Sequence, residues 1–309
     1  MIRAGLLALV IASPAAAEGL TGQALCDAVW AKVVASMKDL AVNGRVAPMQ
    51  GDWCVVEAPL VAFDDVYPLD WQADRLRFTG SALGWLVDGS VLPERLEIEV
   101  EGLRMLVRTG IPQMDWLFAA QARPNRIEAR AALSWDAAAR SLRLDELRVD
   151  FPGENLVELS ATATGVDLSS DAAVQMSATG FALTGLDLHV ETHGLFEWYA
   201  LMTLGPMVMP QEGDMDAAAE AIRADLLAAI AELPATSFSA AGKAALVALV
   251  QELPNPAGDL VVAVKAAPGI GPVRLGGYVM TGVPATVAAA APVFEGVKVD
   301  VGWTHADAP

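Results

Sequence analysis

The densest group of side chains that could do chemistry is Asp187, His189, Glu191 and His193, which alternate along one short stretch. Alternate residues of a strand point to the same face, so two imidazoles and two carboxylates would share one surface. Such groups can ligate Zn²⁺, but His189 and His193 would lie about 13 Å apart along a strand, too far for easy joint ligation. A metal site made of a His-x-Glu pair and a third ligand from elsewhere in the chain remains an alternative. The alternation itself favours a solvated face, and we predict no metal site.

Motifs that would specify a reaction or a cofactor are missing from the sequence. It contains no Gly-x-Ser-x-Gly elbow, no His-Glu-x-x-His pair, no phosphate-binding loop and no dinucleotide fingerprint. Gly269 to Pro272 is glycine-rich but lacks the following Lys and Ser or Thr of a phosphate cradle. Acidic pairs such as Asp64-Asp65 and Asp145-Glu146 carry little information in so acidic a chain. We expect neither enzymatic activity nor a cofactor.

The first residues are typical of a secretory signal peptide. Arg3 precedes an apolar run, and Pro14 to Ala17 offers the small residues that a signal peptidase requires. The apolar run is well short of the roughly 20 residues that a membrane-spanning helix needs. We predict cleavage after Ala17, export to the periplasm, and no transmembrane span.

Cys26 and Cys54 are the only cysteines. In an exported chain, two such cysteines are expected to pair as a disulfide, here between an N-terminal helix and the first strand. A catalytic or metal-binding thiol pair is the alternative, but neither CxxC spacing nor a nearby histidine supports it.

The charge excludes several classes of partner. The chain has 38 acidic and 20 basic residues and a formal net charge of -18. A nucleic-acid partner would require basic patches, so we exclude it, and the same excess disfavours binding to anionic lipid headgroups by charge.

Alternation of apolar and polar residues from Arg126 to His193 predicts an antiparallel meander. The parity shifts between Leu144 and Leu147, which predicts a bulge. Two further strands are expected at Val174–Ala178 and Leu183–Val190. The near-continuous apolar run from Leu260 to Val264 predicts a strand covered on both faces.

Apolar residues at helical spacing predict the helices. The first runs from Leu20 to Leu40, and others begin near Gly194 and after the N-caps Asp214 and Ser239. A short Ala-rich helix is predicted from Thr281 to Ala291. We therefore expect an α+β fold, a curved antiparallel β-meander sheet with a helical segment packed on one side. After the signal peptide at 1–17, its parts are an N-terminal helix at 18–45, a β-rich region at 46–193, a helical segment at 194–256, and C-terminal strands with a short helix at 257–309, within the same domain.

Several features resemble the exported β-meander proteins of Gram-negative bacteria, loosely the AsmA-like group. These are the signal peptide, the similar tetrapeptides Gly-Leu-Arg-Met at Gly102 to Met105 and Gly-Leu-Asp-Leu at Gly185 to Leu188, the stretch Leu142 to Val149, and the helix that begins at Gly194. The likeness covers residues 96–204. It implies an apolar, lipid-handling β-groove in the periplasm. The usual transmembrane anchor of the group is missing, so we do not expect a membrane-bridging role.

Two functions fit this sequence. The first is a periplasmic protein that binds a lipid or other apolar ligand between the sheet and the helices, because 54% of the residues are apolar and flexible methionines adapt to irregular ligands. The predicted lining residues are Phe196, Trp198, Met202, Met207 and Met209. The second is an envelope structural or interaction protein with a protein partner and no small-molecule ligand, which would present an exposed apolar patch or an uncovered strand edge.

Overall fold

The fold is seen in a computed structural model of the 309-residue chain. The structure describes residues 20–37, 40–62, 69–88, 92–201, 205, 208–210, 212–272, 274–275, 286–287 and 289–306. The signal peptide at 1–17 and most of the helix predicted from Thr281 to Ala291 lie outside these residues.

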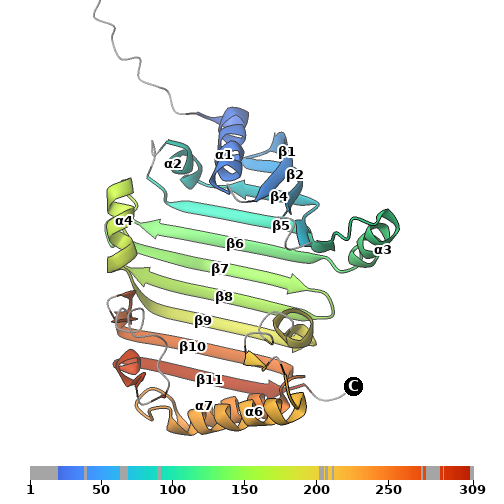
Figure 1. Ribbon diagram of the computed structural model, residues 1–309. Helices are drawn as coiled ribbons and strands as arrows, with labels where there is room; N and C mark the ends of the chain where they lie inside the picture. Colours follow the sequence, from blue (N-terminus) through green and yellow to red (C-terminus); the bar gives the residue numbers. More distant parts are fainter. Residues whose placement is uncertain are drawn as a thin grey trace, which may run out of the picture.

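An 11-stranded antiparallel sheet forms the body of the molecule (Figure 1). Its order is β1-β2-β3-β5-β6-β7-β8-β9-β10-β11, and β4 pairs with β2 and β5. The predicted α+β fold with a meander sheet is confirmed. The strands are β1 Ala41–Gln50, β2 Trp53–Ala62, β3 Leu69–Gln72, β4 Arg75–Thr79, β5 Arg95–Val107, β6 Ile127–Asp136, β7 Ser141–Phe151, β8 Asn155–Thr164, β9 Ala182–His193, β10 Ala257–Ile270 and β11 Val297–His305.

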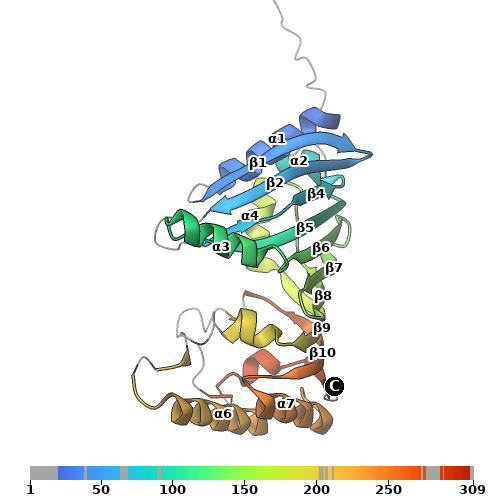
Figure 2. The same ribbon diagram turned by 90° about the vertical axis from the view of Figure 1, so that its right-hand side faces the viewer.

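The helices are placed around this sheet, and α1, α3, α6 and α7 lie on the same side of it (Figure 2). In Figure 1, α4 runs along one set of strand ends and α3 projects from the other. The helices are α1 Gly22–Ser36, α2 Ala82–Asp88, α3 Pro112–Ala122, α4 Asp171–Gly180, the π-helix η1 Phe196–Leu201, α6 Met215–Glu232, α7 Ala240–Glu252 and the 3-10 helix η2 Ala291–Phe294.

The pairing register gives the sheet two chemically different faces. On one face a continuous row of apolar residues crosses the sheet, each paired with the next. Its members are Phe78, Ile98, Ala131, Leu147, Leu159, Leu188, Val262 and Val301. The predicted bulge is confirmed, because the β7–β8 register shifts between Leu144 and Leu147.

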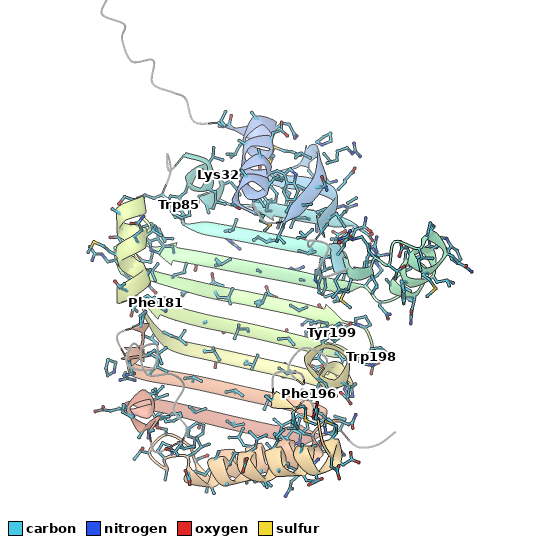
Figure 3. All side chains as sticks on the ribbon, viewed as in Figure 1. Lys32, Trp85, Phe181, Phe196, Trp198 and Tyr199 are labelled. Carbon is cyan, nitrogen blue, oxygen red and sulfur yellow. A yellow bond between two sulfur atoms is a disulfide. The ribbon has the colours of Figure 1, made fainter. Side chains whose placement is uncertain are left out.

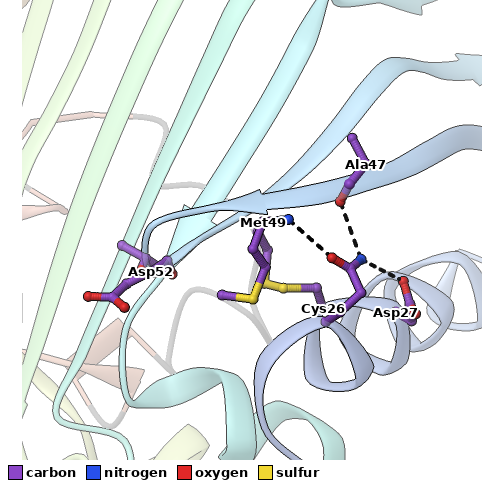
Figure 4. Close-up of a disulfide and its surroundings, with 8 residues drawn as sticks. Cys26, Asp27, Ala47, Met49 and Asp52 are labelled. Atoms are coloured by element: carbon purple, nitrogen blue, oxygen red, sulfur yellow. Dashed lines mark hydrogen bonds between the residues drawn. A yellow bond between two sulfur atoms is a disulfide. The ribbon is translucent and has the colours of Figure 1, made fainter.

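Helix α1 covers the first end of this apolar face. Val29 and Trp30 of α1 are buried against Val56 of β2 and Phe78 of β4. The predicted pairing is confirmed, since Cys26 of α1 bonds to Cys54 within this core (Figure 4). Cys54 lies on β2 rather than on the first strand, because Ala41–Gln50 already forms β1. The same helix is fixed to β1 by Gln23, whose side chain donates to the Ala47 carbonyl and accepts from the Met49 amide.

Helix α7 covers the opposite end. It packs against β11, where a Cβ added to Gly242 would lie 3.5 Å from the amide nitrogen of Val301. The Trp303 indole donates to the Glu252 carboxylate at 2.9 Å. The outer edge of β11 is also partly paired, because the Val299 amide donates to the Ser237 carbonyl.

Two predictions about strands are wrong. Val174–Ala178 belongs to helix α4, because the Ser170 hydroxyl caps the helix start and the segment is rich in alanine, the best helix former. Leu260 to Val264 does form a strand, but it is not covered on both faces, since the Val261 side chain is 50% exposed.

Candidate functional site

In the middle of the sheet, no helix among the described residues lies over the apolar face. At one end of the apolar row Phe78 is buried in the core under α1, and at the other end Val301, itself partly buried, lies against Gly242 of α7. Ala131, Leu147, Leu159 and Leu188 between them are also partly buried. Neighbouring apolar side chains on the same face are partly buried as well. We call the central set the apolar trough, and it consists of Ala131, Leu144, Leu147, Val149, Val157, Leu159, Leu186, Leu188 and Val190.

No described helix packs along the trough. Among the described residues, the main helix–sheet contacts are those of α1, α2, α3 and α7 with β1, β2, β5 and β11. The π-helix η1 contacts the end of β7, where the Tyr199 and Phe151 rings lie 4.8 Å apart between centroids. Apolar side chains on one face of a sheet normally pack against another layer, so this face can accept an apolar occupant.

A cavity of 180 Å³ lies on the same face beside α2. Its walls include Leu96, Leu133 and Leu142 of the sheet and Trp85 of α2. Leu133 pairs directly with Leu144, so the cavity lies next to the trough. Trp85 and Trp135 are held in place because their indole nitrogens donate to the carbonyls of Leu168 and Val166.

Only some of the residues predicted to line the site are described. Phe196 and Met209 are partly buried, and Trp198 is 77% exposed (Figure 3). Met202 and Met207 lie outside the described residues. None of those that are described lines the 180 Å³ cavity beside α2.

The residues predicted from the sequence to line a ligand site include neither Tyr199 nor the trough residues. Tyr199 is the described aromatic of η1 whose ring contacts the sheet, and burial raises the pKa of its hydroxyl. The alternation identified the apolar residues of β6 to β9 but not whether a helix would cover them. That depends on where the 194–256 segment folds, which no local pattern encodes.

The opposite face of the sheet is charged. A second cross-strand row contains Arg77, Glu99, Arg130, Arg148, Glu158 and His189. Arg77 pairs with Glu99, and Arg148 pairs with both Asp150 and Glu158. The hydrogen bond from His189, together with Arg148, lowers the pKa of Glu158. A 260 Å³ depression on this face is lined mainly by these charged groups, which are unsuited to an apolar ligand.

Helix α3 carries a separate exposed apolar surface. It has no buried residue, and Trp116 is 61% exposed. Ile111, Met114 and Leu117 are exposed with it. Asp115 fixes the start of the helix by accepting from the amide and hydroxyl of Thr109, which lowers its pKa.

The chain matches no protein-family model, and no curated protein matches it. The resemblance to the AsmA-like group therefore stays a prediction. Among the described helices, none has the length and apolar character needed to cross a bilayer.

Proposed function

We propose that this protein binds a lipid or another apolar ligand with the apolar trough, in the periplasm. The observation that carries the proposal is the row from Phe78 to Val301, whose ends contact α1 and α7 and whose centre is not packed under any helix that the structure describes. The ligand would lie on Leu147, Leu159 and Leu188 and extend toward the cavity beside α2.

The dimensions suit an acyl chain. Four neighbouring strands, β6 to β9, span about 14 Å at about 4.8 Å per strand. Burial of an apolar chain contributes about 0.8 kcal/mol per methylene, so about ten methylenes contribute about 8 kcal/mol. That is the binding free energy of a dissociation constant of about 1 μM, before the entropic cost of association.

Several features support a periplasmic location. A disulfide persists in oxidising compartments, which supports an exported protein. The signal-peptide pattern of residues 1–17 and the likeness to the AsmA-like group both point to the periplasm.

The test is native mass spectrometry, with solvent extraction, of the protein exported to the periplasm and purified without detergent. We expect a bound mass that extracts as lipid. The double variant L159S/L188S should lose it, because two polar hydroxyls would replace the centre of the apolar row.

The matched control is V261S, which makes the same kind of change on the charged face, where Val261 pairs with His189. This variant should retain the bound mass. A clean apo mass for the wild type, or equal loss in both variants, would count against the trough as the binding site.

A second function, an envelope interaction protein, is favoured by helix α3. Its exposed Trp116 and Leu117 form the kind of apolar surface that marks protein interaction sites. Under this alternative W116S/L117S abolishes binding to a protein partner and leaves any lipid bound to the trough in place.

A further inference from the structure

On the charged face, His189 and Glu191 of β9 lie beside Asp259 of β10. Glu191 and Asp259 are direct cross-strand partners, and His189 is two residues from Glu191 on the same face. One potential ligand atom from each of the three residues lies within 4.8 Å of the others. His193, which the sequence placed in the same cluster, is not part of this group.

The two carboxylates face each other across neighbouring strands. Like charges directly opposite each other on paired strands are destabilising. Within the described part of the chain, no lysine or arginine forms an ion pair with Glu191 or Asp259. The residue that pairs with His189 on β10 is Val261, which cannot supply positive charge.

The imidazole of His189 is oriented for ligation. Its Nδ1 lies 3.3 Å from the Glu158 carboxylate, which also accepts from the Arg148 guanidinium. An ionised Glu158 accepts a hydrogen bond, so it favours the tautomer with the proton on Nδ1. The lone pair of Nε2 then faces Glu191, whose Oε1 is 3.8 Å away. Histidines that ligate metals commonly donate their other ring N–H to a carboxylate in this way.

We propose that His189 Nε2, Glu191 and Asp259 bind a Zn²⁺ ion on the charged face. Ligand atoms around tetrahedral Zn²⁺ at about 2.0–2.1 Å are about 3.4 Å apart, so rotation of the two carboxylates must bring them closer. Asp259 is exposed and Glu191 partly exposed, which leaves them free to rotate. The imidazole distinguishes the site from one for Mg²⁺ or Ca²⁺, which take oxygen ligands.

The experiment titrates the full mature protein with ZnCl₂ against a chromophoric chelator, with circular dichroism to check the fold of each variant. The wild type should bind one equivalent of Zn²⁺. His189→Ala and Asp259→Asn should each weaken binding tenfold or more, and Glu158→Gln should weaken it about tenfold by releasing the imidazole.

His305→Ala is the matched control, because His305 also forms a His–Glu pair, with Glu252 at 3.1 Å. It should leave the affinity unchanged. Absence of stoichiometric Zn²⁺ binding by the wild type, or undiminished binding by both His189→Ala and Asp259→Asn, would overturn the proposal. The trough lies on the other face, so L159S/L188S should bind Zn²⁺ like the wild type, and the two proposals fail independently.

Discussion

At the scale of single residues, Asp74 joins neighbouring strands of the N-terminal half. Its carboxylate accepts from Arg104 at 2.7 Å and also pairs with Arg126. Gly102 lies against this carboxylate at φ 67°, where the β5–β6 register shifts. A Cβ at Gly102 would collide with the Asp74 carboxylate and the Arg126 guanidinium, so this ion pair requires glycine at position 102.

Asp74→Asn tests the pH dependence of this contact. The hydrogen bond from Arg104 is the largest cause that lowers the pKa of Asp74 below its ordinary 3.8. A carboxyl whose pKa is lowered by folding stabilises the protein above its ordinary pKa, and this stability is lost as the pH falls through the lowered value.

The variant should therefore be less stable than the wild type at pH 7, by about 1 kcal/mol or less because the pairs are partly solvated. The difference should shrink as the pH falls below 4, measured by urea unfolding at each pH. A difference that is unchanged at pH 3 would contradict this account.

At the scale of elements, α4 depends on its cap. The Ser170 hydroxyl accepts from the Ala173 amide, whereas Thr21, at the same position of α1, makes no such hydrogen bond. Ser170→Ala should cost about 1 kcal/mol. Thr21→Ala should cost less than about 0.5 kcal/mol, the usual range for surface changes. Denaturant unfolding measures both, and equal effects would refute the distinction.

The disulfide between Cys26 and Cys54 also holds an element in place, because it joins α1 to β2. It closes a loop of 28 residues between α1 and β2. In the chain-entropy account, its loss costs about 3 to 4 kcal/mol. The C26S/C54S variant should show this loss in urea unfolding, and reduction of the wild type should reproduce it. A loss below about 1 kcal/mol would show that the packing of Trp30 and Phe78 alone holds α1 in place.

Local signals predicted most elements well. Asp214 and Ser239 were predicted as N-caps, and each side chain accepts from backbone amides at the start of its helix. The parity shift at Leu144 to Leu147 identified the bulge because one extra residue changes the face of every residue after it. The strand predicted at Val174–Ala178 was wrong because its short apolar alternation fits a strand while its alanines and the Ser170 cap favour a helix.

At the scale of the whole molecule, the sheet has one apolar face and one charged face. The face with the apolar trough carries leucine and valine rows, and the other carries paired charges from Arg77 to His189. Strand alternation predicted these two faces, but the sequence could not show which strands the helices leave uncovered. For that reason the sequence predicts a ligand between the sheet and the helices but identifies only Phe196, Trp198 and the methionines as its lining, and no strand residues.

The most direct test of the trough uses a fatty acid with a diazirine at the end of its acyl chain. After irradiation with the exported protein, mass spectrometry of peptides locates the cross-linked residues. We predict cross-links on β7, β8 and β9 at trough residues such as Leu147, Leu159 and Leu188, with none on the charged face. Cross-links confined to α3, or none that excess unlabelled fatty acid competes away, would contradict the proposed function.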